Sequence, residues 1–183
     1  MNYKKLLQIS VFTALSLGTV TSFSSCKTAS VPNHIKVVTP FDIKKFDGTW
    51  YEIARFDFKH EKDLSNVTAN YTLKENGGVQ VLNKGYNYVK NNWEEAKGKA
   101  KFTSSNNDGS LQVSFFGPFY AGYHVVMMEP DYETALIFGD TTDNIWILSR
   151  TKTISEATKQ KYLTHAKKAG YDLNRMVWTK HDK

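Results

Sequence analysis

The fold is indicated most strongly by one stretch, Gly48-Thr49-Trp50-Tyr51-Glu52-Ile53-Ala54-Arg55-Phe56-Asp57-Phe58. It opens on a glycine, carries one tryptophan near its start, and then alternates small, charged and aromatic residues as a β-strand does. Successive side chains of a strand point to opposite faces. Strict alternation predicts that one face carries Trp50, Glu52, Ala54 and Phe56, and the other Tyr51, Ile53 and Arg55. Because both faces carry large apolar groups, we expect another element to cover the outside of this strand.

Seven further strand-like segments follow, each bounded by turn signals at short spacing. They span 67–74, 79–86, 93–103, 111–116, 122–129, 134–139 and 145–150. The turn at 75–78, Glu-Asn-Gly-Gly, is a strong hairpin signal because Asn-Gly tolerates positive φ. Sequential antiparallel strands joined by tight turns predict an all-β, up-and-down meander. Closing that meander into a barrel removes its exposed edges.

One helix is predicted after the eighth strand, over 153–169. Thr153 and Glu156 fit a capping box, with a threonine at the N-cap and a glutamate three residues later. One face of this helix is lined at every fourth residue by Ile154, Thr158, Tyr162 and Ala166. Residues 176–178 form a short final strand. The apolar face of the helix is the predicted cover for the first strand.

Four segments together resemble the lipocalin family, and within it the bacterial and apolipoprotein D-like members. They are Gly48-Thr-Trp-Tyr-Glu-Ile-Ala-Arg55, Asn83-Lys-Gly-Tyr86, Val113-Ser-Phe-Phe-Gly-Pro-Phe-Tyr120 and Trp146-Ile-Leu-Ser-Arg-Thr151. The resemblance covers nearly all of 41–180. It implies an eight-stranded antiparallel up-and-down β-barrel, the lipocalin or calycin fold, with one C-terminal α-helix packed outside. It also implies a structural signature in which Gly48 and Trp50 open the first strand and Arg150 stacks on the Trp50 indole.

A barrel of this size either holds one small apolar ligand or is filled by its own side chains. Small residues interleaved with aromatic ones favour a cavity, and they are Ala54, Ala69, Gly98 and Ala100. By alternation, the candidate ligand-binding residues are Glu52, Ala54, Phe56, Tyr71, Phe102, Phe115, Tyr123 and Trp146. Glu52 is expected to be a lone inward carboxylate that meets a polar headgroup or a buried water, or forms a structural hydrogen bond. The loop His60-Glu61-Lys62-Asp63 is expected to be solvated at the barrel mouth.

The N-terminus is predicted to be an export signal of the lipoprotein type. Lys4 and Lys5 precede an apolar stretch without acidic residues, and small residues then lead to Cys26, the only cysteine of the chain. We expect Cys26 to be acylated; the alternative is an ordinary signal peptide with Cys26 as a bystander. The predicted divisions are a signal peptide at 1–25, a tether at 26–40 and a lipocalin domain at 41–183. With Lys27 after the cysteine, the resemblance implies a lipid anchor in the outer membrane of a Gram-negative bacterium, facing the periplasm.

Composition argues against several other functions. The net charge of +6 falls to +4 once Lys4 and Lys5 are removed, and the basic residues are spread out, so no nucleic-acid partner is expected. A single cysteine excludes an intrachain disulfide. The five histidines lack metal-site spacing, which leaves haem ligation by His124 and calcium binding by Asp140-Thr-Thr-Asp143 as alternatives. Neither a metal nor a cofactor is expected.

The family's bacterial members are outer-membrane lipoproteins that bind fatty acids or phospholipid-derived ligands. The resemblance therefore implies a carrier or scavenger of a small amphipathic lipid. We expect a monomer or weak dimer without catalytic activity. One alternative is a scaffold that binds another envelope protein through the barrel mouth. Another is a lipid-modifying enzyme, for which Glu52 would be the only poised acid–base group inside.

Overall fold

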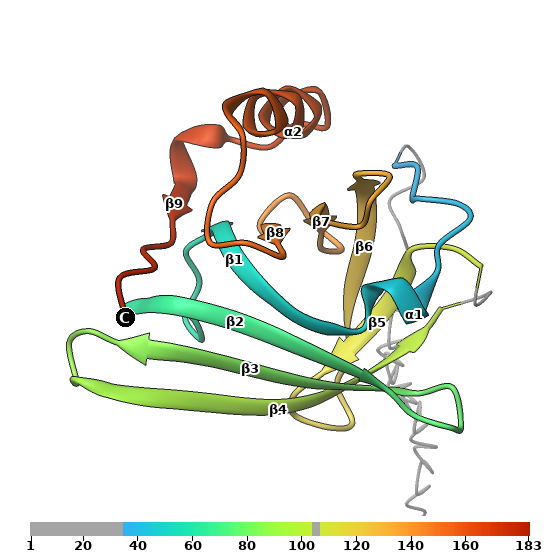
Figure 1. Cartoon of the computed structure of the whole chain (residues 1–183), viewed down its shortest axis with the longest axis horizontal. Coiled ribbons are helices and arrows are strands. Elements are labelled where there is room, and N and C mark those ends of the chain that lie inside the picture. Colours follow the sequence, from blue (N-terminus) through green and yellow to red (C-terminus); the bar gives the residue numbers. More distant parts are fainter. Residues whose placement is uncertain (1–34, 104–106) are drawn as a thin grey trace, which may run out of the picture.

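The computed structural model describes residues 35–103 and 107–183, which form an antiparallel sheet closed into a barrel (Figure 1). The barrel strands are β1 (Gly48–Phe56), β2 (Leu64–Leu73), β3 (Val79–Asn87), β4 (Asn92–Phe102), β5 (Ser110–Ser114), β6 (Ala121–Met128), β7 (Thr134–Phe138) and β8 (Ile145–Ser149). The other elements are α1 (Ile43–Phe46), α2 (Glu156–Lys168), the 3-10 turn η1 (Leu173–Arg175) and β9 (Met176–Trp178). All eight predicted barrel strands are present in the predicted order.

Strand β1 closes the barrel because it pairs with both β2 and β8. Tyr51 lies opposite Thr68 of β2 on one side and opposite Ser149 of β8 on the other. The other barrel strands pair with their neighbours in sequence, which gives the order β2-β3-β4-β5-β6-β7-β8-β1. Backbone groups on both sides of β1 therefore find partners, and the sheet has no free edge there. The predicted up-and-down barrel is confirmed.

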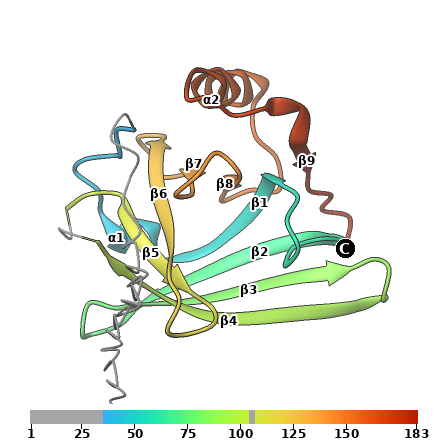
Figure 2. The same ribbon diagram turned by 180° about the vertical axis from the view of Figure 1, so that it is seen from behind.

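Helix α2 and strand β9 lie outside one wall of the barrel (Figure 1, and Figure 2 from behind). Tyr162 and Ala166 of α2 are fully buried against the outward side chains of β1, β6, β7 and β8. The Tyr162 hydroxyl donates a hydrogen bond to the Thr134 carbonyl at 2.8 Å. Strand β9 pairs with the end of β1, where Ala54 lies opposite Trp178. These elements are the cover that the two-sided apolar pattern of β1 predicts.

Helix α2 begins later than predicted. Its N-cap is Ser155, whose hydroxyl oxygen accepts a hydrogen bond from the Thr158 backbone N–H at 3.0 Å. Glu156 is thus the first helical residue, and the predicted capping box from Thr153 to Glu156 was wrong. Ser155 supplies an equivalent hydroxyl cap and leaves Ile154 to pack on the barrel wall before the helix begins.

One end of the barrel is closed by Trp50, Arg150 and α1. Trp50 is fully buried, and its indole N–H donates to the Phe46 carbonyl at 2.8 Å. The guanidinium carbon of Arg150 lies 3.9 Å from the centre of the Trp50 ring. Arg150 also donates to three backbone carbonyls, those of Lys45, Asp47 and Thr49. Gly48 begins β1 with φ +96°, a conformation that favours glycine. Arg150 thus stacks on Trp50, as the family resemblance implies.

A β-bulge in β1 changes which of its side chains face the interior. The pairing with β8 shifts between Glu52 and Ala54, so that Ile53 is the extra residue. Past the bulge, Arg55 lies on the same side as Glu52 and bonds to it, whereas Ala54 and Phe56 pack outward in the core beneath α2. The prediction that Ala54 and Phe56 face the lumen was wrong, because one inserted residue reverses the alternation of everything that follows it.

Candidate functional site

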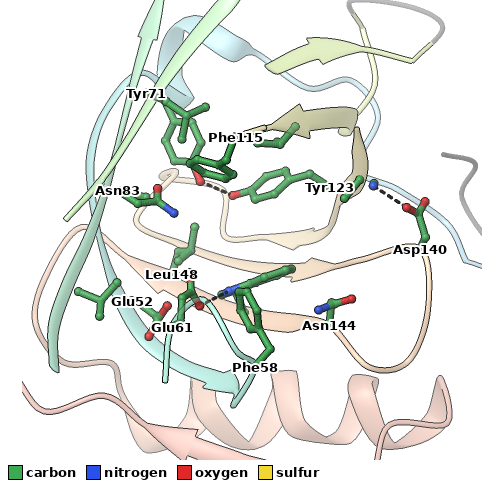
Figure 3. Close-up of a pocket in the computed structure, with 17 residues that line it drawn as sticks. Glu52, Phe58, Glu61, Tyr71, Asn83, Phe115, Tyr123, Asp140, Asn144 and Leu148 are labelled. Carbon is green, nitrogen blue, oxygen red and sulfur yellow. Dashed lines mark hydrogen bonds between the residues drawn. The ribbon is translucent and has the colours of Figure 1, made fainter. Parts of the chain in front are cut away.

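The barrel encloses a cavity of about 210 Å³ (Figure 3). Its walls come mainly from β1, β2, β3, β5, β6 and β8, and the loops after β1 and β7 contribute to its open end. The apolar and aromatic lining residues are Phe58, Val67, Ala69, Tyr71, Val81, Val113, Phe115, Ala121, Gly122, Tyr123, Trp146 and Leu148. The polar ones are Glu52, Glu61, Asn83, Asp140 and Asn144. An apolar pocket with a few convergent polar groups is the usual form of a small-ligand site.

The structure brings together most, but not all, of the predicted ligand-binding residues. The cavity is lined by Glu52, Tyr71, Phe115, Tyr123 and Trp146. Phe102 packs against the inner core of the barrel without lining the cavity. Ala54 and Phe56 lie in the separate core between the barrel and α2. Direct contact of the lining residues with a ligand stays a prediction.

Two tyrosines form the floor of the cavity. The hydroxyls of Tyr71 and Tyr123 are 2.7 Å apart and share a hydrogen bond across the barrel. The Tyr71 ring packs on Phe46 with ring centres 5.0 Å apart, and Phe46 packs on Trp50 at 4.6 Å. Burial raises the pKa of both phenols, so both remain neutral at physiological pH. The floor is therefore aromatic, with its only polar atoms paired to each other.

A buried ion pair lies in the wall of the cavity. Arg55 Nη1 donates to Glu52 Oε1 at 2.7 Å, and the Thr179 hydroxyl donates to the same oxygen at 2.6 Å. Arg55 Nη2 donates to the Glu61 carbonyl oxygen at 2.6 Å. Burial opposes the charge of Arg55, but the neighbouring carboxyl groups of Glu52, Glu61 and Asp57 together outweigh burial and raise the pKa of Arg55. Glu52 is therefore not the lone carboxylate that the sequence predicts, because a buried cation holds it.

Glu61 is a second carboxyl group in this wall, shown beside Glu52 in Figure 3. It is only 9% exposed, and its Oε2 accepts a hydrogen bond from the Trp146 indole N–H at 3.1 Å. Burial raises the pKa of Glu61 to about 8, assisted by the charge of Glu52 and opposed by the Trp146 hydrogen bond and Arg55. The prediction that Glu61 is solvated was wrong. The loop after β1 turns inward, so that Phe58 packs edge-on against Trp146 with ring centres 5.8 Å apart.

The room in the cavity comes from fewer small residues than the sequence suggests. Ala69 lines it, whereas Ala100 is buried in the surrounding core. A Cβ atom on Gly98 would lie 2.8 Å from the Phe115 ring, so that ring already occupies the space above the glycine. Because Gly98 has no side chain, the Phe115 ring can pack directly over it, and the glycine adds no volume for a ligand.

His124, the candidate haem ligand, is fully buried and does not line the cavity. Its Nδ1 lies 3.1 Å from the Ser110 hydroxyl, and its Nε2 lies 3.5 Å from Asp140 Oδ1. Burial lowers the pKa of His124 despite the nearby Asp140 carboxylate. This Ser–His–Asp order resembles a hydrolase triad, but Ser110 is only 4% exposed and is not among the lining residues. Within 35–103 and 107–183, no group of three or more His, Cys, Asp or Glu side chains could hold a metal ion.

The predicted signal peptide, the lipidation site Cys26 and the first part of the tether lie outside the described residues. The last part of the tether is packed on the barrel: Val38 donates to the Val125 carbonyl and accepts from the Gly109 N–H, both at 2.9 Å. In the described part of the chain, no helix combines the length and apolarity needed to cross a membrane.

Comparison with known proteins identifies the family. A model described as a lipocalin-like domain matches residues 41–181. The chain is 46% identical over 156 residues to the outer membrane lipoprotein Blc of Citrobacter freundii, covering 85% of this chain and 88% of the relative. It is 42% identical over 149 residues to Blc of Vibrio cholerae, covering 81% and 87%. Insecticyanin of the tobacco hornworm Manduca sexta has the same fold, with a TM-score of 0.63 at 20% identity over 83% of this chain and 86% of that one. The chain therefore belongs to the lipocalin family and is similar to its bacterial outer membrane lipoproteins.

Proposed function

We propose that this protein binds a single-chain amphipathic lipid, such as a fatty acid or lysophospholipid, and stores or transports it in maintenance of the bacterial envelope. The observation that carries this proposal is the apolar cavity, which ends on the Tyr71–Tyr123 floor and has its carboxyl groups in the wall. A flexible acyl chain needs an apolar tube and few directional bonds.

The positions of the polar groups in and near the cavity favour lipid binding and transport over catalysis. Glu52 already accepts hydrogen bonds from Arg55 and Thr179, so it is poorly placed to abstract a proton. The Ser110 hydroxyl is buried against Thr103 and His124, away from the cavity lining. We therefore propose a carrier without enzymatic activity.

We also propose that the mature chain is held by lipid on Cys26, at the periplasmic face of the outer membrane, as a monomer or weak dimer. Residues 1–25 would be removed as the signal peptide, and the segment from Cys26 to Pro40 would join the anchor to the barrel. Support comes from the sole cysteine lying at the end of the predicted export signal and from relatives named as outer membrane lipoproteins.

A second candidate function is a scaffold that binds another envelope protein through the barrel mouth. Phe116 and Phe119, on the loop after β5, are 67% and 77% exposed, and the Phe116 ring lies 5.6 Å from the His60 ring of the loop after β1. Exposed apolar groups gathered at one end of a molecule often mark a contact surface. This surface favours the scaffold as the alternative to lipid carriage.

Titration of tryptophan fluorescence with a fatty acid or lysophospholipid tests the proposal. We expect a saturable change with a Kd in the micromolar range, about 8 kcal/mol of binding free energy. Trp146→Ala should remove most of the signal and weaken binding, because Trp146 lines the cavity. Trp178→Ala is the matched control, since Trp178 lies outside the barrel at 40% exposure. Absence of saturable binding by single-chain lipids of any common length would favour the scaffold.

A further inference from the structure

The charged residues that line the cavity all carry the same sign. The carboxyl groups of Glu52, Glu61 and Asp140 reach the lining, whereas no lysine, arginine or histidine of the described residues does. Glu52 and Glu61 lie together at one side of the cavity, and Asp140 lies apart from them (Figure 3). A ligand whose polar group enters beside Glu61 therefore meets acidic side chains.

The nearest cation, Arg55, is not free to bind an anionic headgroup. Arg55 is only 1% exposed, and its Nη atoms bond to Glu52, Thr179 and the Glu61 carbonyl. Within the described part of the chain, its Nε makes no hydrogen bond but lies 3.8 Å from Glu61 Oε2. Arg55 does not line the cavity. The buried carboxyl groups of Glu52 and Glu61 thus share one cation, Arg55. A third carboxylate, that of Asp57, lies 3.5 Å from Arg55 Nη2. When both glutamates are ionised, the group carries excess negative charge.

A further polar atom in the lining points to a ligand that donates hydrogen bonds. The side-chain oxygen of Asn83 is buried and has no hydrogen-bond partner among the described residues. Asn83 comes from β3 and projects into the cavity above Glu52 and Glu61 (Figure 3). A buried acceptor without a donor is unfavourable, so a donor supplied by the ligand would stabilise it. This observation is independent of the carboxyl groups.

We propose that this wall of the cavity selects lipids with an ammonium group, so that a single-chain amine binds more tightly than the fatty acid of the same length. The ammonium contacts the carboxylate of Glu61, with Glu52 and Asn83 close by, and the chain runs along Val67, Val113 and Leu148 towards the tyrosine floor. An ammonium supplies the missing positive charge and up to three N–H donors. Once Glu61 is ionised, a fatty-acid carboxylate in the same position is repelled by like charge in a site shielded from water. This inference rests on the proposed lipid-binding function and specifies its ligand class.

Calorimetric titration of the full chain with decylamine, decanoic acid and 1-decanol tests the inference. The titration is made at about pH 9, where Glu61, whose pKa burial raises to about 8, is ionised and a primary amine is still protonated. Each of the three probes has ten carbons, and their polar groups are cationic, anionic and neutral, respectively. We expect decylamine to bind at least about tenfold more tightly than decanoic acid, with 1-decanol between them, because like charges juxtaposed in a buried site weaken binding strongly. Equal affinities, or tighter binding of decanoic acid, would overturn the inference.

The Glu61→Gln variant tests whether Glu61 causes the preference for the amine. The variant retains an oxygen that can accept from the Trp146 indole, and we expect the preference for the amine over decanoic acid to fall to within about threefold. Asp143→Asn is the matched control, because Asp143 is an exposed carboxylate in the loop after β7 and does not line the cavity. A full amine preference in Glu61→Gln would refute the assignment. If 1-decanol and decanoic acid bind but the amine has no advantage, the inference alone fails. If none of the three binds, the proposed function fails with it.

Discussion

The contact between Trp50 and Arg150 allows a quantitative test of how the closed end stabilises the barrel. Trp50 is fully buried, its indole N–H bonds to Phe46, and the Arg150 guanidinium lies 3.9 Å from its ring centre. Trp50→Ala should lower the free energy of unfolding by roughly 3–5 kcal/mol, the usual range for a buried tryptophan. Arg150→Ala should cost less, roughly 1–3 kcal/mol, because water can replace its bonds to partly exposed carbonyls.

The two losses should not add. Once either partner is removed, the cation–π stack is already lost, so the double variant should be less destabilised than the sum by about 1–2 kcal/mol. The assay is equilibrium urea unfolding of the two single variants and the double variant, followed by circular dichroism.

A solvent-exposed pair of the same chemistry provides the control. Lys159 Nζ lies 4.3 Å from the Trp178 ring centre, and Trp178 is 40% exposed. The coupling energy between Lys159 and Trp178 should be about 0.5 kcal/mol, at the low end for exposed pairs. Coupling of Trp50 with Arg150 no larger than this would refute the view that the stack seals the barrel end.

Three further predictions concern the anchor, Glu61 and the aromatic wall. Cys26→Ala should release the protein into the soluble periplasmic fraction, since the acyl chains would be lost; retention in membrane pellets after a high-salt wash would place the anchor elsewhere. Folding raises the pKa of Glu61 from 4.5 to about 8. Its contribution to the free energy of unfolding is therefore most favourable below pH 4.5, where the carboxyl group is protonated in both states, and is lost as the pH rises to about 8. Between about pH 5.5 and 7.5, the free energy of unfolding of the wild type should therefore fall by roughly 2–3 kcal/mol relative to that of Glu61→Gln, at up to about 1.4 kcal/mol per pH unit. Parallel curves of unfolding free energy against pH would contradict this. Gly98→Ala should displace the Phe115 ring into the cavity and weaken lipid binding severalfold, whereas unchanged affinity would show that the ring moves elsewhere.

The sequence predicts those features that follow from periodicity and a strong local motif. Alternation and turn residues are enough for the eight strands. The Trp50–Arg150 stack follows from the family resemblance, because both residues lie in segments that carry that resemblance. The bulge at Ile53 is different, since nothing in a period-2 pattern marks an inserted residue. It reverses the face of every later residue in β1, and the lumen positions assigned to Ala54 and Phe56 were wrong for that reason.

The carboxyl group of Glu61 could not have been found from local sequence. The segment from His60 to Asp63 is charged and follows a strand, which ordinarily indicates a solvated loop. Its burial depends on contacts with residues distant in sequence, the bond from Trp146 and the bond between its own carbonyl and Arg55. The inward position of Arg55 in turn depends on the bulge. One irregularity in β1 therefore determines both the geometry and the charge of this wall of the cavity.

Lipid content measured on intact protein tests the central claim most directly. The full chain is purified from its native membrane and examined by mass spectrometry under conditions that preserve non-covalent complexes, beside an Ala69→Phe variant. Ala69 lines the cavity, so a phenylalanine there should fill much of its volume. We predict about one single-chain lipid per wild-type chain and little in the variant, with both proteins folded. A wild-type protein free of lipid, or equal lipid in the two proteins, would contradict the account.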